Sequence, residues 1–271
     1  PFHQQLLDDL YSVIEGAGGT VILSGVSSGR DERAALAGLV SYRCGAVIVL
    51  GAGLGDQQLL DAAGGIPLVS IARPTGAGIS WVSSDDRRGM RLAVEHLADL
   101  GHRDVLFAAA ENAAGAAERH QGFEEAVAEH GLQGSVEIGG ATEVSGADLA
   151  VRLLERDRLP SSVIAFNDRA ALGLMDVLVR HGVNIPQDIS IVGNDDSEIA
   201  SRHYVDLTTV AQDTRLLAEG AAELARQRMH SGPAETSAES GDVQGRVVPV
   251  ELVVRGTTGP PRTDGDVTSS Q

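Results

Sequence analysis

The chain has 271 residues, of which 42% are hydrophobic and 22% charged, a composition typical of a globular protein with enough material for two ordinary domains. Its formal net charge of −17 argues against a nucleic-acid interface within this portion, because phosphate contacts need clustered lysine and arginine side chains. One cysteine rules out an internal disulfide, no run of 18 apolar residues offers a membrane span, and no secretory signal is visible. We therefore expect a protein of the reducing cytoplasm that does not contact membranes.

Amphipathic helical patterns alternate with apolar runs of strand length along the whole chain. The expected helices span residues 4–15, 31–43, 56–63, 86–100, 116–130, 146–157, 168–181 and 213–229. The expected strands span residues 20–24, 46–50, 67–71, 104–109, 136–138, 163–166, 189–192, 207–210 and 246–255. Residues 231–245 are rich in Gly, Ser, Glu and Ala, which predicts an exposed, mobile loop.

This alternation predicts an α/β fold of doubly wound parallel sheets that carry helices on both faces. About ten strands are too many for one such sheet, so two sheets are expected. The first unit begins with a helix, whereas a doubly wound sheet begins with a strand beside its centre. We therefore expect the first strand of the first sheet to lie upstream of Pro1.

Polar residues follow two expected strands of the second unit, and these residues are the first candidates for a ligand site. Asn167 stands at the end of one strand and Asp195 at the end of another, 28 positions later. Arg119 enters a helix beyond a third strand end. In a parallel sheet these ends share one edge, where open α/β folds bind ligands. An amide, a carboxylate and a guanidinium suit a polyhydroxylated small molecule, but a structural salt-bridge network between loops explains the same spacing equally well.

Two glycine motifs suggest other activities. Residues 51–55, GAGLG, follow a strand, but their spacing is wrong for a dinucleotide fingerprint, and a plain turn is favoured. Residues 25–29, GVSSG, match the G-x-S-x-G nucleophile elbow around Ser27, although no histidine stands at a clear strand end of the same unit. Cys44 is expected to be a small core residue, and the eight histidines show no metal-ligand spacing. Asp85 and Asp86 open a helix and are most simply interpreted as a cap with a dipole-matched charge.

Several segments, in this order, resemble the lactose-repressor/galactose-repressor family of bacterial transcription regulators in their effector-binding part. They cover nearly the whole chain, and each is moderately specific. The matching segments are Pro1-Phe2 (end of "NPFF"), LADLGHRDV (97–105), ERHQGFEEA (118–126), FNDRAALG (166–173), IPQDISIVGNDD (185–196), LTTV (207–210) and VELVVRGTT (250–258).

The resemblance implies a periplasmic-binding-protein-like fold of type I, with two subdomains joined by three crossovers. The implied division gives residues 1–83 with 207–249 to the first subdomain and 84–206 with 250–258 to the second, followed by a disordered tail at 259–271. The effector would lie in the cleft, with Arg119, Asn167 and Asp195 as polar contacts and with Phe2 and His3 near the ligand. The family also implies a homodimer and an upstream helix-turn-helix headpiece that binds operator DNA; neither DNA-binding element is in this sequence.

The sequence departs from the family pattern at three places that bear on the effector. His3 replaces the second aromatic of "NPFF", Ala72 replaces an acidic pocket residue after the third strand, and Asn194 replaces an aromatic before the two acids. Because aromatic residues are only 3% of the chain, a sugar is favoured over a stacked purine. We expect a sugar-responsive regulator that is not an enzyme and needs no cofactor or metal; a transport-associated sugar-binding protein of the same fold is the alternative.

Overall fold

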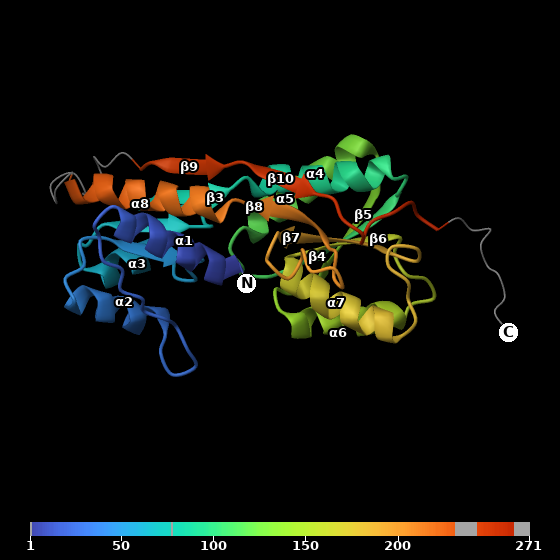
Figure 1. The fold of residues 1–271 in the computed structure, drawn as a ribbon, viewed down its shortest axis with the longest axis horizontal. Helices are drawn as coiled ribbons and strands as arrows, with labels where there is room; N and C mark the ends of the chain where they lie inside the picture. The colour runs from blue at the N-terminus through green and yellow to red at the C-terminus, as the bar shows by residue number, and fades with distance from the viewer. Residues whose placement is uncertain (1, 77, 231–242, 263–271) are drawn as a thin grey trace.

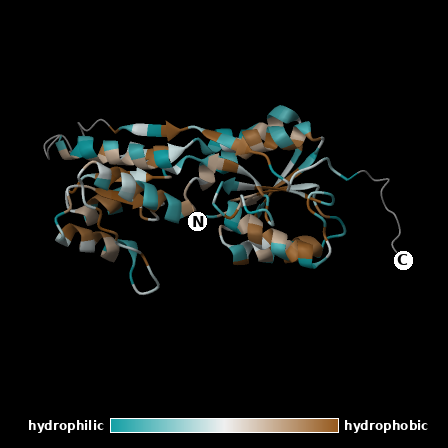
Figure 2. Cartoon of the chain, viewed as in Figure 1, coloured by the Kyte–Doolittle hydropathy of each residue, from teal (hydrophilic) through white to brown (hydrophobic). Residues whose placement is uncertain are grey.

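Two layered units lie end to end in the computed structural model, which describes residues 2–76, 78–230 and 243–262 (Figure 1). Each unit is a sheet with helices on both faces, and together they confirm the expected α/β class with two sheets. Hydrophobic residues concentrate in the strands and on the helix sides that face them, whereas the outer helix surfaces are mostly hydrophilic (Figure 2).

The first subdomain is built on a four-stranded parallel sheet in the order β1-β2-β3-β9. Its strands are β1 (Val47–Leu50), β2 (Leu68–Ile71), β3 (Ser80–Ser84) and β9 (Gly245–Val248). One face is covered by α1 (Phe2–Gly16) and α8 (Thr214–His230), and the other by α2 (Glu32–Ser41) and α3 (Asp56–Ala63). Buried aliphatic side chains from helices and strands form a core on each face.

The second subdomain has a six-stranded sheet in the order β10-β8-β7-β6-β4-β5, parallel except where β10 runs antiparallel to β8. Its strands are β4 (Asp104–Ala109), β5 (Gln133–Ile138), β6 (Ser162–Ala165), β7 (Ser190–Asp195), β8 (Thr208–Gln212) and β10 (Val250–Val253). The helices are α4 (Asp86–Asp99) and α5 (Ala116–His130) on one face, with α6 (Glu143–Leu154) and α7 (Asp168–Arg180) on the other.

Helices α6 and α7 pack unusually close because each presents a glycine to the backbone of the other. A Cβ on Gly146 would lie 2.0 Å from the carbonyl oxygen of Ala170, and one on Gly173 would lie 1.8 Å from that of Glu143. Only a residue without a side chain allows this approach, which lets the two helices cover the sheet as one tight layer.

The chain passes between the subdomains at three neighbouring points. It leaves the first sheet after Ser84 at the end of β3, returns after Gln212 at the end of β8, and leaves again at Pro249. The Oγ of Ser84 donates a 2.6 Å hydrogen bond to the side-chain oxygen of Gln212. Ser84 also pairs with Val248, and Gln212 with Val250, so the three crossings lie side by side.

Two expectations about the second and third crossings need correction. Residues 207–212 were expected in the first subdomain, but β8 pairs with β7 and belongs to the second sheet. The single strand expected at 246–255 is two strands in different sheets, β9 and β10, separated by Pro249. Proline has no N–H to donate to a sheet ladder, which explains why the pairing changes there.

Two further segments differ from expectation. Residues 20–24 form no strand, because no neighbouring strand pairs with them among the residues described. Residues 259–262, expected in a disordered tail, are packed: the carbonyl oxygen of Gly259 lies 2.9 Å from His102 Nε2, and Arg262 pairs with Asp188 at 3.2 Å. The rest of the expected mobile loop (231–242) and tail (263–271) lies outside the described residues.

Candidate functional site

Arg119 is a buried arginine in the first turn of α5, at the edge of the second sheet that faces the first subdomain. Its Nε donates to Asp86 Oδ1 at 2.7 Å, and its Nη1 donates to the carbonyl oxygen of Phe166 at 2.5 Å. The guanidinium carbon also lies 4.5 Å from the centroid of the Phe166 ring. These contacts fix the planar group in one orientation.

Asp86, at the start of α4, is the direct ion-pair partner of this arginine. Asp85 caps the helix by accepting from the Arg88 backbone N–H, which leaves the Asp86 carboxylate free for Arg119. Gly115, with φ of +75°, permits the approach, since a Cβ there would lie 2.6 Å from Asp86 Oδ2. Burial alone would lower the pKa of Arg119, but the charges of Asp86, Asp195 and Asp168 raise it above its ordinary value, so the guanidinium is charged.

Asp195 ends β7 with a φ of +126° and is held by two amide side chains. Its Oδ1 accepts from Gln212 Nε2 at 2.7 Å and from the neighbouring Asn194 Nδ2 at 3.1 Å. Burial raises the pKa of Asp195 to about 7, against the opposing charge of Arg119. This carboxyl group therefore titrates near neutral pH, and its link to Gln212 connects the site to two of the crossings.

Asp168, in the first turn of α7, is a second buried carboxyl group near Arg119. It accepts hydrogen bonds from the Ser197 backbone N–H and Oγ, both at 2.7 Å, and from Thr209 Oγ1 at 2.6 Å. Burial raises its pKa to about 6, and these three donors oppose that rise. Asp168 thereby ties the loop after β7 to β8 beneath the site.

Asn167 has a structural role at the end of β6. Its Oδ1 accepts from the Ala170 backbone N–H at 2.9 Å and so caps α7, while its Nδ2 donates to the Ala141 carbonyl oxygen at 3.2 Å. An amide nitrogen carries two hydrogens, so one N–H of this half-buried side chain remains for a ligand.

Phe2 and His3 lie on the first subdomain, at the start of α1. Phe2 packs against the core between α1 and the sheet, and its ring meets the ring of His3 edge-on with centroids 5.8 Å apart. Burial lowers the pKa of His3, and the positive charge of Arg169 on α7 lowers it further. Among the described residues, neither side chain makes a hydrogen bond or ion pair with Arg119 or Asp195.

The structure thus brings Arg119 and Asp195 together, sets Asn167 beside them as a helix cap, and puts Phe2 and His3 on the facing subdomain. The combined set offers N–H donors and carboxylate acceptors, the pattern that binds hydroxyl groups. Ser27, by contrast, is an exposed residue of a turn in which it bridges Arg30. No group of three His, Cys, Asp or Glu side chains within residues 2–76, 78–230 and 243–262 is placed to hold a metal ion.

Comparison with known proteins identifies the class first. A family model for a periplasmic binding protein-like domain matches residues 94–258. A LacI transcriptional regulator from a Rhodococcus species has the same fold with a TM-score of 0.90 at 38% identity, covering 97% of this chain and 96% of that one. The fold is therefore that of a periplasmic binding protein-like domain.

Two further structures give the family more detail. The lac repressor dimer bound to operator and the anti-inducer ONPF matches with a TM-score of 0.81 at 26% identity, over 94% of this chain and 89% of that one. The transcriptional regulator CelR in complex with cellobiose matches with a TM-score of 0.81 at 28% identity, over 95% and 79%. The chain belongs to the LacI family of transcriptional regulators, and it is not an enzyme.

Sequence reasoning missed three residues of the site. Asp85 and Asp86 were interpreted as a cap with a dipole-matched charge, and Asp85 is the cap, but Asp86 is also the buried ion-pair partner of Arg119; the useful signal was a second acid directly after a strand end. Asp168, the first residue of the expected helix at 168–181, was not singled out, and it is a buried carboxyl group that accepts hydrogen bonds from Ser197 and Thr209. Gln212 gave no signal in the sequence, because its contact with Asp195 depends on the unpredicted pairing of β8 with β7.

Proposed function

We propose that the chain is the effector-sensing part of a bacterial DNA-binding regulator, with a sugar bound between its two subdomains. The observation that carries this proposal is the buried, charged Arg119 held in a fixed orientation beside Asp195 at the sheet edge facing the first subdomain. Arg119, Asn167 and Asp195 would contact hydroxyl groups from the second subdomain, and Phe2 and His3 would close the site from the first.

A sugar is favoured over a stacked purine because the polar groups dominate. Apart from Phe2, His3 and Phe166, the candidate contacts are charged or amide side chains, and Phe166 already stacks on Arg119. The complex of the related CelR with cellobiose supports the same class of ligand. Asn194, buried and bonded to Asp195, is the residue through which effector choice would differ from that of relatives with an aromatic side chain there.

The proposed mechanism is a shift between two placements of the subdomains. A ligand that touches both subdomains favours the closed arrangement over the open one, and only this difference in affinity can move the equilibrium. A DNA-binding headpiece attached to the first subdomain would sense that placement. The coupling must be reciprocal, so operator DNA changes the effector affinity by the same factor as the effector changes the DNA affinity.

The site assignment is tested by calorimetric titration after a thermal-shift screen against a panel of sugars and nucleosides. We expect a sugar to raise the melting temperature, and Arg119→Ala and Asp195→Asn each to weaken its binding by at least tenfold. Arg33→Ala, which removes an exposed arginine, is the matched control and should bind as the unaltered protein does. Unchanged affinity in both site variants would refute the assignment, and nucleoside binding without sugar binding would refute the ligand class.

Homodimer formation, a cytoplasmic location and operator binding through a helix-turn-helix ahead of Pro1 are further parts of the proposal. The related lac repressor, a dimer bound to operator, supports the first and the last. Sedimentation at micromolar concentration should give a dimer, and a monomer there would contradict the proposal.

A further inference from the structure

The edge of the first sheet that faces the second subdomain is apolar at two of its strand ends. Strands β1 and β2 are parallel, with Leu50 opposite Ile71, so their carboxyl ends share one edge. The chain crosses to the second subdomain from this same edge, after Ser84 of β3. The residues at or just after the two strand ends are Leu50, Gly51, Ala52 and Ala72, and none of them has a polar side chain.

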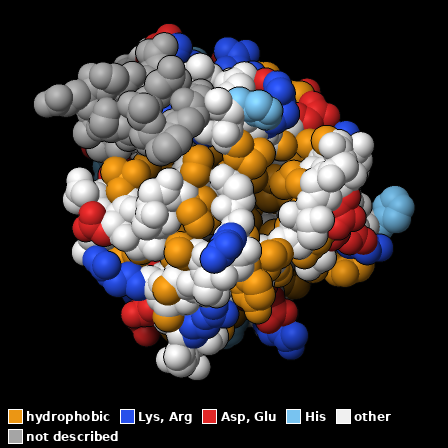
Figure 3. Space-filling view, turned by 90° about the vertical axis from the view of Figure 1, so that its left-hand side faces the viewer, with side chains coloured by type: hydrophobic (Ala, Val, Ile, Leu, Met, Phe, Trp, Pro, Cys, Tyr) orange, Lys and Arg blue, Asp and Glu red, His pale blue; other side chains and the backbone are white. Residues whose placement is uncertain are grey.

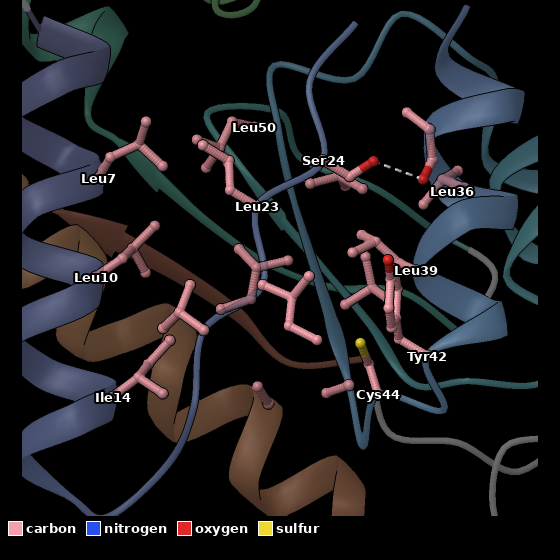
Figure 4. A pocket seen from close by; sticks show the side chains of 18 of the residues that line it. Leu7, Leu10, Ile14, Leu23, Ser24, Leu36, Leu39, Tyr42, Cys44 and Leu50 are labelled. Carbon is pink, nitrogen blue, oxygen red and sulfur yellow. Dashed lines mark hydrogen bonds between the residues drawn. The ribbon is translucent and has the colours of Figure 1, made fainter.

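The beginning of α1 lies at the same edge. Leu7 of α1 lies near Leu50 at one end of a cavity inside the first subdomain, whereas Ile14 of α1 lies at the other end (Figure 4). Phe2, Leu50 and Ala72 pack against the core that α1 and α8 form with the sheet, and all three remain half-buried. We call these three residues the apolar wall.

The polar residues next to the apolar wall are bonded within their own subdomain. Arg73 Nη2 donates to the carbonyl oxygen of Leu54 at 3.0 Å and pairs with Asp56, also at 3.0 Å. Ser70 Oγ donates to the carbonyl oxygen of Arg73 at 2.9 Å. At the outer end of the same subdomain, by contrast, charged side chains of both signs surround the hydrophobic ones (Figure 3).

Small apolar residues of both subdomains meet beside Arg119. A Cβ on Gly51 would lie 3.6 Å from the Cβ of Ala114 in the second subdomain. Ala114 precedes Gly115, where an added Cβ would lie 3.4 Å from Arg119 Nε. Residues 113–117, AAGAA, also have no polar side chain. The apolar wall is therefore continued into the second subdomain, next to the charged part of the candidate site.

The backbone of Ala72 is in a conformation that alanine rarely adopts. Its φ is +68°, in the left-handed region, where Gly, Asn and Asp are the usual residues. Its N–H donates to the carbonyl oxygen of Val82 at 2.9 Å, which fixes this conformation. Among the described residues, four of the five other non-glycine residues with positive φ are indeed Asn or Asp: Asn112, Asp195, Asp196 and Asp206. Strain of this kind gathers at functional sites, so the methyl group of Ala72 points to a need for an apolar contact there.

We propose that Ala72 determines effector specificity, and that the apolar wall receives an edge of the sugar that carries no hydroxyl group, as in a deoxy sugar. This inference rests on the proposed function and narrows its class of ligand. The hydroxyl groups of the sugar are bound by Arg119, Asn167 and Asp195, and the deoxy carbon lies against Ala72 and Leu50.

The preference follows from the cost of an unpaired hydroxyl group. A sugar with a hydroxyl at this edge would lose hydrogen bonds to water and gain none from the apolar wall. An apolar pocket discriminates against an added hydroxyl by about ten- to a hundredfold, which is less than a polar pocket discriminates against a missing one. The simpler alternative, a fully hydroxylated sugar whose C–H face stacks on Phe2, predicts no preference for the deoxy form.

Calorimetric titration with pairs of sugars that differ by one hydroxyl group tests the proposal. The pairs are D-fucose and D-galactose, L-rhamnose and L-mannose, 2-deoxy-D-glucose and D-glucose, and 2-deoxy-D-ribose and D-ribose. In at least one pair we expect the deoxy sugar to bind about tenfold more tightly than its partner. Ala72→Asn suits the left-handed backbone and adds an amide to the wall, so it should abolish or reverse this preference. Ala17→Asn, at an exposed position beyond the other end of α1, is the matched control and should keep it.

The outcomes separate this proposal from the proposed function. If sugars of the panel bind and every hydroxylated partner binds as tightly as its deoxy form or more tightly, the deoxy preference is refuted while sugar binding stands. If the preference persists unchanged in Ala72→Asn, Ala72 is not the residue that determines it. If neither member of any pair binds, the proposed sugar-sensing function is contradicted, and this inference with it.

Discussion

At the scale of single residues, the candidate site has more carboxyl groups than cationic groups, with three acids around the one guanidinium of Arg119. Arg119 is paired directly with Asp86, and Asp195 and Asp168 lie near enough to stabilise its charge. Hydrogen bonds from Gln212, Asn194, Ser197 and Thr209 hold the two outer acids in place. Ionisable groups with strongly shifted pKa values gather at functional sites, and the raised pKa values of Asp168 and Asp195 therefore favour a binding role for this cluster.

The raised pKa of Asp195 makes the stability of the protein depend on pH. Its folded-state value of about 7 lies above the ordinary value near 4, so the folded protein binds more protons than the unfolded chain between these limits. The contribution of Asp195 to the free energy of unfolding is therefore fully present below about pH 4 and is lost as the pH rises toward 7. Urea unfolding at pH 5, 6, 7 and 8 should show a smaller loss with rising pH in Asp195→Asn than in the unaltered protein.

A matched substitution on the surface isolates this effect from the general response to pH. Asp157→Asn removes an exposed carboxyl group on the same subdomain and should keep the slope of the unaltered protein. If Asp195→Asn also kept that slope, Asp195 would not be the titrating group.

The two roles of Asn167 can be separated by substitution. Asn167→Ala removes the helix cap and should lower the free energy of unfolding by about 0.5–2 kcal/mol. Asn167→Ser keeps an oxygen that can cap α7 and should recover most of that stability. Because neither variant has an amide N–H to offer, both should lose sugar affinity in calorimetry. Recovery of affinity in the serine variant would assign Asn167 a purely structural role.

At the scale of helices and strands, the local patterns predicted most elements but not their pairing. The amphipathic helical pattern over residues 168–181 predicted α7 correctly, since such a pattern acts within one helix. The mostly apolar run at 246–255 predicted one strand, because the break at Pro249 does not by itself say that the two halves join different sheets. Residues 20–24 have a strand composition, yet a strand forms only when a neighbour pairs with it, and no strand among the described residues does so.

The candidate site divides in the same way, into residues that local patterns indicate and residues that only tertiary contacts reveal. Arg119, Asn167 and Asp195 could be singled out because the strand ends of a parallel sheet share an edge whatever the tertiary detail, and their role as ligand contacts stays a prediction. Asp86 and Gln212 were missed because their roles arise from contacts across 33 and 17 positions of sequence. Composition and periodicity carry no record of which polar side chain meets which partner.

The close packing of α6 on α7 gives a prediction at this scale. Gly173→Ala would set a methyl group against the Glu143 carbonyl oxygen, and overpacking of this kind costs about 1–3 kcal/mol. Gly16→Ala, where nothing lies within 4 Å of the added carbon, is the control and should leave stability unchanged or slightly raised. Chemical denaturation of both variants decides between them; equal stability would mean that the two helices can separate without cost.

At the scale of the whole molecule, the candidate contacts are divided between two subdomains that share few covalent links. Arg119, Asn167 and Asp195 belong to the second, and Phe2 and His3 to the first. A ligand held by both groups must draw them together. No helix among the described residues is long and apolar enough to cross a membrane.

Closure should be visible in solution scattering. A saturating sugar should reduce the radius of gyration of the protein, because it favours the arrangement in which both walls touch the ligand. Saturation at about 100 times the Kd should also raise the free energy of unfolding by about 2.7 kcal/mol. Arg119→Ala should show neither change at the same sugar concentration, whereas Arg33→Ala should show both. A ligand that binds without any compaction would contradict the proposed coupling between the subdomains.

The three crossings have a mechanical consequence. Ser84, Gln212 and the Val248–Val250 segment are hydrogen-bonded to one another, so the links form a narrow band and not three separate tethers. A band of this kind resists sliding and twisting of one subdomain against the other, but it allows the subdomains to bend about the line along which the three links lie. The subdomains therefore have one soft degree of freedom between them. Asp195, bonded to Gln212 within that band, joins the bending axis to the candidate site.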